Sequence, residues 1–436
     1  MNKGKKRTAW VLVFLVILLS ALLIDEQPNK EYLELTKVTN VDNSAWLDFQ
    51  NLASLNINAK EPLIKYQEFI NILQLSGAEK AKLFLTENEP YLRLDFDISE
   101  HCNSTGNKKV EFYDCLDDYV KRMSSIKNEL LEHSLILDRI NKSEHIFNAK
   151  VDTEIISQIN SNNGTLLLPD LFRVNHAFDI SHELVAVDKL YQILGSEQKS
   201  QHCKTKFIDA LENRYARVEN SNNLIYAIDN LVKTMYLLDV AIYLTNNYPD
   251  LNECLNSLKI KKSKGILEGL YESMKQEFVA VTLAFDASAK EIQSELPWYN
   301  VFVYKHQKTL NDGSKKHFRT LRNLLEVDSN FFIQKVGIEE PSLLRHWNNI
   351  SGYIMMKVAG YGHVNLKADF ALLSAKFNLV ILNARLKDCE KSEDSSCDKI
   401  LDDFRDPIWG MSPVLNRVEG TLSYIYNDKN KISIPY

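Results

Sequence analysis

The chain has 436 residues, of which 45% are hydrophobic and 25% are charged, and it contains only 14 glycines and 10 prolines. This composition is typical of a globular protein and excludes collagen-like and low-complexity chains. The 58 acidic side chains outnumber the 52 basic ones. Because sequence-independent binding to nucleic acid needs a positive surface, we expect no nucleic-acid partner.

The first feature along the chain is an apolar stretch with charges of opposite sign at its two ends. Residues 9–24 carry no charge, and Ser20 is the only polar residue among them. Four cations within residues 1–8 precede the stretch, and Asp25 and Glu26 follow it. Its length is near the lower limit of a bilayer-spanning helix, about 17 residues. By the positive-inside rule, the pattern predicts a signal-anchor with a cytoplasmic amino terminus and an exported body.

Two other interpretations of this stretch stay open, a cleaved signal peptide and a buried helix of a soluble protein. A signal peptide has an apolar region of about 7 to 15 residues and ends in a small-x-small cleavage site. The nearest such site is Leu19-Ser20-Ala21, in which Leu19 is too bulky. We therefore favour an anchor that is retained in the membrane.

Six cysteines bear on the compartment in which the protein folds. In an oxidising compartment they would form disulfides, whereas cytosolic thiols usually stay reduced. The simplest connectivity is sequential, although free cysteines buried as small apolar residues are the alternative. The three pairs are Cys102 with Cys115, Cys203 with Cys254, and Cys389 with Cys397.

Apolar residues at helical spacing predict a mainly α-helical body with a small C-terminal β-hairpin. Residues 224–242 carry these residues in the alternating steps of a coiled-coil seam, and a helix over 267–285 is the expected partner. Residues 91–98 alternate like a strand, and residues 420–436 have the pattern of a hairpin. The region 364–388 is apolar almost all round, which favours a core helix. The other predicted helices cover residues 62–75, 112–141, 166–194, 199–218, 314–327 and 341–359.

These elements predict five segments. A cytoplasmic tail at 1–8 and the anchor at 9–24 come before a polar stalk at 25–40, a helical periplasmic body at 41–362, and a core helix with the hairpin at 363–436. The predicted location is the inner membrane, crossed once, with the bilayer contacted through the anchor.

The chain contains none of the short catalytic or cofactor-binding motifs that we searched for, such as HExxH, GxSxG or a P-loop, so no catalytic residue or cofactor is assigned. One group of side chains could bind a divalent metal or transfer protons. If residues 170–190 form one helix, His176, Asp179 and Glu183 share a face and His182 lies beside it. A solvated or hydrogen-bonded helix face is the favoured interpretation of these residues.

Two basic segments stand out from the acidic background. One covers residues 259–264, and the other, residues 305–322, has six lysines or arginines and one aspartate. Such segments can bind anionic lipid headgroups, glycans or an acidic protein. A solvated surface is the alternative for both.

The C-terminal region has a D-P-x-x-G-x-x-P pattern formed by Asp406, Pro407, Gly410 and Pro413, followed by a strand at 422–426. This arrangement resembles the end of type II secretion pseudopilins. The chain lacks their prepilin peptidase site and their early glutamate, so incorporation into a pilus is not implied. Its overall layout is similar to that of uncharacterised Gram-negative single-pass inner-membrane proteins with a helical periplasmic body, a resemblance that implies no activity.

The favoured function is that of a membrane-anchored periplasmic protein with a structural or interaction role. Its partner would be another envelope protein or a second copy of the chain, and its pathway is not indicated. The alternative is an envelope hydrolase or metal-dependent enzyme that uses the helix face over residues 176–183.

Overall fold

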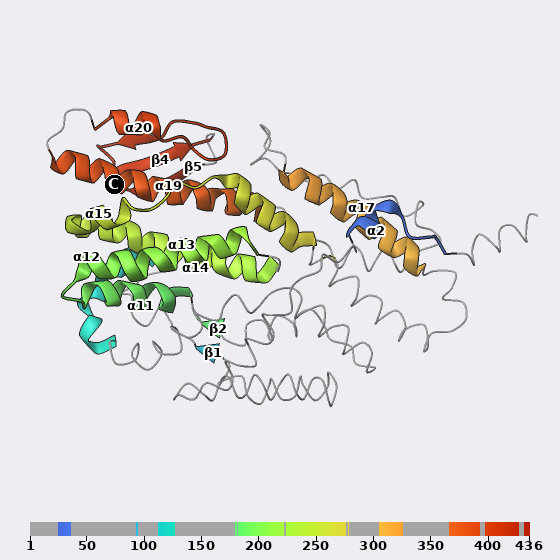
Figure 1. The fold of residues 1–436 in the computed structure, drawn as a ribbon, viewed down its shortest axis with the longest axis horizontal. Coiled ribbons are helices and arrows are strands. Elements are labelled where there is room, and N and C mark those ends of the chain that lie inside the picture. Colours follow the sequence, from blue (N-terminus) through green and yellow to red (C-terminus); the bar gives the residue numbers. More distant parts are fainter. Residues whose placement is uncertain are drawn as a thin grey trace, which may run out of the picture.

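The protein's computed structural model describes residues 25–35, 93–94, 112–126, 179–180, 182–221, 224–275, 278, 305–325, 366–392, 397–426 and 431–436. Over these ranges the fold is mainly helical, with a three-stranded antiparallel sheet near the C-terminal end (Figure 1). The predicted mainly α fold class is confirmed. Within these ranges no helix is long and apolar enough to cross a bilayer. The predicted anchor at residues 9–24 lies outside them.

Helix α14 (Leu224–Asn247) lies in the middle of the helical layer (Figure 1). It confirms the helix that the seam over residues 224–242 predicts. Its neighbours contact it from several sides, so burial extends beyond the seam to Ala227 and Leu237. These neighbours are α7 (Phe112–Lys121), α11 (His182–Leu194), α13 (Ile208–Glu219) and α19 (Leu366–Lys391).

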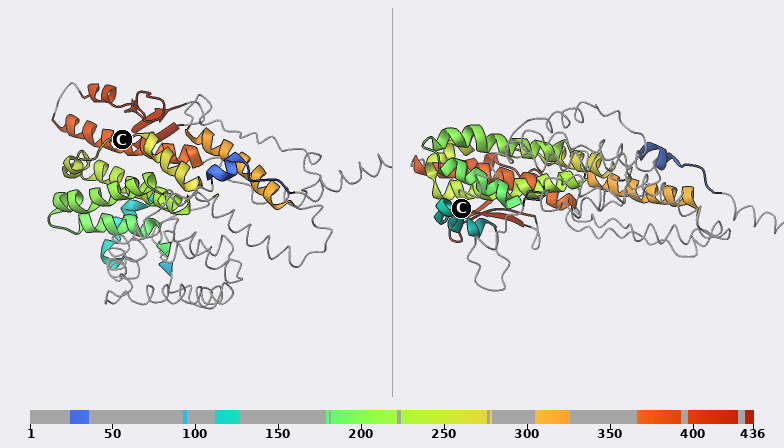
Figure 2. Two further views of the ribbon diagram at one scale, coloured as in Figure 1. Left: turned by 45° about the vertical axis from the view of Figure 1, so that its right-hand side comes forward. Right: turned by 90° about the horizontal axis from the view of Figure 1, so that it is seen from below.

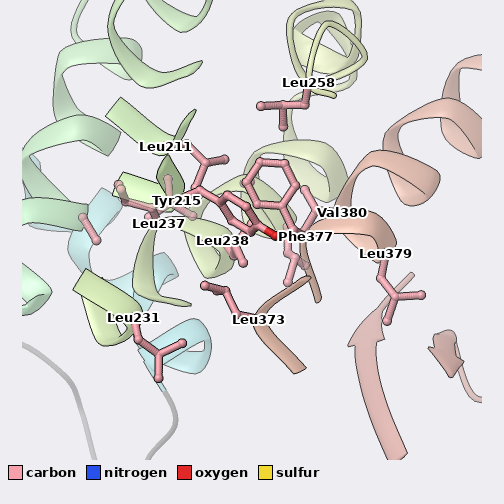
Figure 3. Packing of buried hydrophobic residues seen from close by; sticks show 14 of the residues in the cluster. Leu211, Tyr215, Leu231, Leu237, Leu238, Leu258, Leu373, Phe377, Leu379 and Val380 are labelled. Carbon is pink, nitrogen blue, oxygen red and sulfur yellow. The ribbon is translucent and has the colours of Figure 1, made fainter. Parts of the chain in front are cut away.

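Helix α19 is buried almost all round, as the apolar sequence of residues 364–388 predicts. It packs against α14 and α15 (Asn252–Leu255), and also against the C-terminal sheet. In Figure 3 the rings of Tyr215 and Phe377 meet among leucines of α13, α14 and α19. Their centroids are 5.1 Å apart at an interplanar angle of 68°. Such an edge-to-face pair adds about 0.5–1.5 kcal/mol to the burial of the two side chains.

The C-terminal sheet has the strand order β3-β4-β5, with both pairs antiparallel. Strands β4 (Thr421–Ile425) and β5 (Lys431–Pro435) form the predicted hairpin, in which Leu422 faces Ile434. Strand β3 (Val414–Asn416) extends the predicted hairpin to three strands. It is too short for a period-two pattern to be visible in the sequence.

Two disulfides connect elements of the helical body. Cys203 and Cys254 link the π-helical segment η2 (Cys203–Phe207) to α15, and their Cα atoms lie 6.1 Å apart. Cys389 and Cys397 link the end of α19 to the turn before α20 (Lys399–Asp403). These are two of the three pairs that the sequence predicts. Cys115 is also disulfide-bonded, and Cys102 lies outside the described residues.

The helix predicted over residues 199–218 is present as a continuous helical run. It consists of α12 (Lys199–His202), η2 and α13. After α14 the chain makes a 3₁₀ turn, η3 (Pro249–Leu251), before α15. Proline at the start of this turn ends the preceding helix, as the sequence indicates.

Helices α2 (Lys30–Leu35) and α17 (His306–Leu325) lie side by side at the end of the molecule opposite α12 and α15 (Figures 1 and 2). The helix predicted over residues 314–327 thus begins earlier, at His306. The sequence Asn311-Asp312-Gly313 has the composition of a turn. In the structure these residues are helical because the preceding turn of α17 is capped by a distant part of the chain, which is described below.

Gly269 allows the helix over residues 263–275 to approach the end of α13 closely. A Cβ atom at this position would lie 2.3 Å from the carbonyl oxygen of Glu219 and 2.6 Å from that of Val218. At the same interface the Ser273 hydroxyl donates to the Ser221 carbonyl oxygen at 2.8 Å. Because both contacts of the added Cβ are with backbone atoms, a larger residue forces the two helices apart.

The substitution Gly269→Ala tests this close contact. Alanine in a helix interior is ordinarily about 1 kcal/mol more favourable than glycine. Here we expect the opposite sign, a loss of about 1–3 kcal/mol in the free energy of unfolding, because overpacking displaces backbone. Chemical denaturation measures the change. Glu268→Ala, at the exposed neighbouring position, is the control and should change stability little, and a G269A protein as stable as wild type would contradict the packing.

Candidate functional site

The predicted metal-binding face is not present as one helix. Asp179 lies in strand β2 (Asp179–Ile180), which pairs in parallel with β1 (Arg93–Leu94). Helix α11 begins only at His182, so Asp179 and Glu183 do not share a helical face. The helix predicted over residues 166–194 is therefore wrong at this point, because pairing with a distant strand overrides the local helical spacing.

The other predicted ligand, His176, lies outside the described residues. Among the residues that the structure describes, no group of three His, Cys, Asp or Glu side chains is placed to hold a metal ion. The geometry therefore gives no support to the alternative enzymatic hypothesis, which depends on the helix face over residues 176–183.

A different polar cluster joins α11 to α14. The His182 Nε2 lies 3.1 Å from Asp229 Oδ1, and the Lys233 Nζ donates to Asp229 Oδ2 at 2.7 Å. Burial alone would raise the pKa of the Asp229 carboxyl. The charge of Lys233 and the hydrogen bonds from His182 and Lys233 outweigh burial and hold this pKa well below its usual value.

A histidine held by a buried carboxylate is the arrangement of a general base in many hydrolases. The ring of His182 stacks on Tyr236, with centroids 6.2 Å apart. Catalysis also needs a nucleophile and a group that stabilises developing charge. The contacts described for His182 are those with Asp229 and Tyr236, and neither supplies these groups. The His182–Asp229 contact joins α11 to α14, and the Asp229–Lys233 ion pair lies within α14.

The D-P-x-x-G-x-x-P segment is a turn held together by a buried carboxylate. Asp406 accepts hydrogen bonds from the backbone N–H groups of Ile408 at 2.8 Å, Trp409 at 3.0 Å and Met411 at 2.5 Å. Gly410 has φ +72°, a conformation that glycine adopts without strain. The pattern that resembles pseudopilin ends thus has a local structural explanation.

The same turn fixes the sheet to the helical body. The Ser263 hydroxyl donates to the Pro407 carbonyl oxygen at 2.5 Å. The ring of Trp409 packs edge-on against Tyr426, with centroids 5.5 Å apart. The Asp406 turn is therefore a structural connection.

The residues that directly follow the predicted anchor are bound to the N-terminal end of α17. The Asp25 carboxylate accepts hydrogen bonds from the backbone N–H of Gln307 at 2.8 Å and of Lys308 at 3.1 Å. N–H groups in the first turn of a helix have no partner within that helix. A carboxylate at this position satisfies two of them and interacts favourably with the helix dipole.

Asn311 extends this contact along α17. Its side-chain amide donates to the Gln27 carbonyl oxygen at 2.8 Å and to the Glu26 carboxylate at 3.0 Å. Its Oδ1 accepts from the Asn29 backbone N–H at 3.0 Å. Asn29 in turn accepts from the Tyr32 N–H at 2.7 Å and caps α2. Part of the predicted stalk at residues 25–40 is thus folded against the body.

α17 is in turn connected to the rest of the body. The His317 Nε2 lies 2.8 Å from the Met274 carbonyl oxygen, and the His317 ring stacks on Phe278 at 4.9 Å. Met274 belongs to the helix over residues 263–275, which packs on α13 through Gly269. A continuous chain of contacts thus leads from Asp25 to the central helices.

No protein-family model, curated protein or solved structure matches this chain. The functional conclusions therefore depend on sequence and geometry. Sequence reasoning missed the contacts of Asp25 and Asn311 with distant parts of the chain, and it missed the Asp229 cluster. An acidic residue directly after an apolar segment was the only local signal for the first of these. Nothing local links Asp25 to Gln307.

The substitution Asp229→Asn tests the polar cluster of His182, Asp229 and Lys233. Removing one partner of a buried ion pair costs about 3–5 kcal/mol of unfolding free energy. Because the folded-state pKa of Asp229 lies below the ordinary value of 3.8, its contribution is present above that pH and is lost as the pH falls below it. Urea denaturation should therefore show a large difference between wild type and D229N at pH 7.

That difference should shrink as the pH falls toward about 3. Asp209→Asn, on the exposed side of α13, is the matched control and should change stability little. An Asp229→Asn protein with wild-type stability at pH 7 would show that the cluster is not a stabilising link.

Proposed function

We propose that the chain is a single-pass inner-membrane protein of the Gram-negative envelope, anchored by residues 9–24, with its folded body in the periplasm. Its role is structural or interactive, and the body binds another envelope protein or a second copy of itself. The chain resembles uncharacterised single-pass inner-membrane proteins. The proposal adds to this resemblance a specific arrangement, in which the anchor leads directly into the folded body.

The observation that carries the proposal is the contact between Asp25 and the N-terminal end of α17. Asp25 is the first residue after the apolar stretch, and it accepts two backbone hydrogen bonds from α17. The anchor would therefore lead into the folded body without a free linker. This arrangement favours an anchor that is not cleaved from the body. It also favours an anchor that is held in a fixed position relative to the body.

The cysteines support export. Every cysteine that the structure describes is in a disulfide, which is typical of proteins that fold in an oxidising compartment. The bond between Cys203 and Cys254 closes a long loop, and such a constraint stabilises a fold by about 2–4 kcal/mol.

Exposed apolar side chains on the C-terminal sheet support an interaction role. Val414 in β3 is 44% exposed, and Ile425 at the end of β4 is 42% exposed. Val418, in the turn between these strands, is 97% exposed. Exposed apolar side chains such as these are available for contact with another protein.

Membrane extraction with a designed control tests the anchor. We expect the wild-type chain, made in a Gram-negative host, to remain in the membrane pellet after alkaline carbonate extraction. The substitution Leu19→Ala creates an Ala-x-Ala cleavage site ending at Ala21. It should release the body into the soluble periplasmic fraction, with a new amino terminus that mass spectrometry identifies.

The same preparations report on the compartment. Denatured but unreduced protein should expose no reactive thiols, because all cysteines would be oxidised. A wild-type body that is soluble after carbonate extraction would contradict the anchor. Six reactive thiols in natively expressed protein would contradict export.

A further inference from the structure

Helix α17 carries a stripe of cations on the side opposite its buried face. Lys308, Lys315, Arg319 and Arg322 follow one another at helical spacing, which places them within about 60° of arc around the helix axis. Lys315, Arg319 and Arg322 are exposed. Asp312 is the only acidic residue in the helix. The opposite side of the helix is buried and includes Leu310, Ser314, His317 and Leu321.

The position of this stripe relative to the predicted anchor is set by the Asp25 contact. The N-terminal turn of α17 binds the first residue after the apolar stretch. From this point the helix extends for about 30 Å. Both views in Figure 2 show α17 beside α2, the helix that follows residues 25–29 in the chain.

The contacts of α17 also engage two of the acids near its N-terminal end, whose charge would oppose binding to an anionic surface. Asp25 accepts hydrogen bonds from the N–H groups of Gln307 and Lys308, and Glu26 accepts one from the Asn311 amide. Both carboxylates are thus directed at the helix. Along the exposed side of α17 itself, the three cations Lys315, Arg319 and Arg322 outnumber the one acid of the helix, Asp312.

We propose that α17 lies along the surface of the bilayer, with Lys315, Arg319 and Arg322 directed at the phosphates of anionic lipid headgroups. This inference rests on the proposed anchor, which brings the bilayer within one residue of the α17 contact. A row of cations matches the extended anionic surface of a membrane, and each basic residue near such a surface is worth about fivefold in binding. These cations are far from residues 9–24 in sequence, so they do not oppose the orientation set by the positive-inside rule.

Lysine footprinting of the full chain in vesicles tests the proposal. The chain is reconstituted in phosphatidylcholine vesicles with and without phosphatidylglycerol, and acetylation of each lysine is followed by mass spectrometry. We expect Lys315 to react about fivefold more slowly in the phosphatidylglycerol vesicles. Lys206, Lys262 and Lys399, which are exposed elsewhere on the body, should react equally in both. Salt at about 1 M should remove the protection, because it screens charge within about 3 Å.

Two double variants distinguish an effect of the cation stripe on α17 from an effect of the protein's total charge. Arg319→Gln with Arg322→Gln should abolish most of the lipid-dependent protection of Lys315. Lys206→Gln with Lys262→Gln removes the same charge from other exposed positions and should leave that protection unchanged. All four positions are on the surface, so folding is preserved in both variants, which circular dichroism checks.

The possible outcomes distinguish this inference from the anchor itself. If the chain floats with both kinds of vesicle but Lys315 reacts equally in them, the anchor stands and the lipid contact is wrong. If the chain does not float with phosphatidylcholine vesicles, the proposed anchor fails and the inference fails with it. Protection of Lys315 that appears only when a periplasmic protein fraction is added would assign the stripe to an acidic protein and overturn the lipid contact.

Discussion

The burial of one apolar helix sets the arrangement of the rest of the body. α19 has apolar side chains around almost its whole circumference, so it is stable only when other elements cover most of its surface. Helices α13, α14 and α15 cover part of its surface and the C-terminal sheet covers another part. The sheet is held in that position by the Asp406 turn, whose proline carbonyl accepts a hydrogen bond from Ser263 of the helical layer.

The helices and strands that the sequence predicts are those whose pattern lies within one short stretch of the chain. Apolar residues at helical spacing predict α14 from residues 224–242. The almost entirely apolar sequence of residues 364–388 predicts the buried helix α19. The hairpin of β4 and β5 follows from alternation. The bonds of Cys203 with Cys254 and of Cys389 with Cys397 match the simplest of the connectivities that six cysteines permit.

The features that sequence does not predict depend on contacts between distant residues. Asp179 has helical spacing to Glu183, yet it pairs with residues 93–94 as a strand. The sequence Asn311-Asp312-Gly313 resembles a turn, yet it lies within α17 because Asp25 and Gln27 satisfy polar groups of the helix. Local helix or turn propensity is a weak guide to structure where a polar group finds its hydrogen-bond partner in a distant part of the chain.

The polar groups inside the body are used mainly to join elements. Asp229 connects α11 to α14, Asp406 closes the turn before the sheet, and Asn311 joins α17 to residues 25–29. Each is hydrogen-bonded to more than one group, as buried polar side chains require. The described part of the protein is a body of linked helices in which residues 25–29 are joined to α17.

The central claim is that Asp25 is bound to the N-terminal end of α17 in the full chain. Hydrogen exchange of the Gln307 and Lys308 amides in the full chain, reconstituted in lipid, tests it most directly. We predict that both amides are protected in wild type and that Asp25→Ala accelerates their exchange about fivefold, since a helix cap is worth about 1 kcal/mol. Glu26→Ala should leave these two amides unchanged because Glu26 contacts Asn311 instead. Unprotected amides in wild type, or equal exchange in wild type and D25A, would contradict the claim.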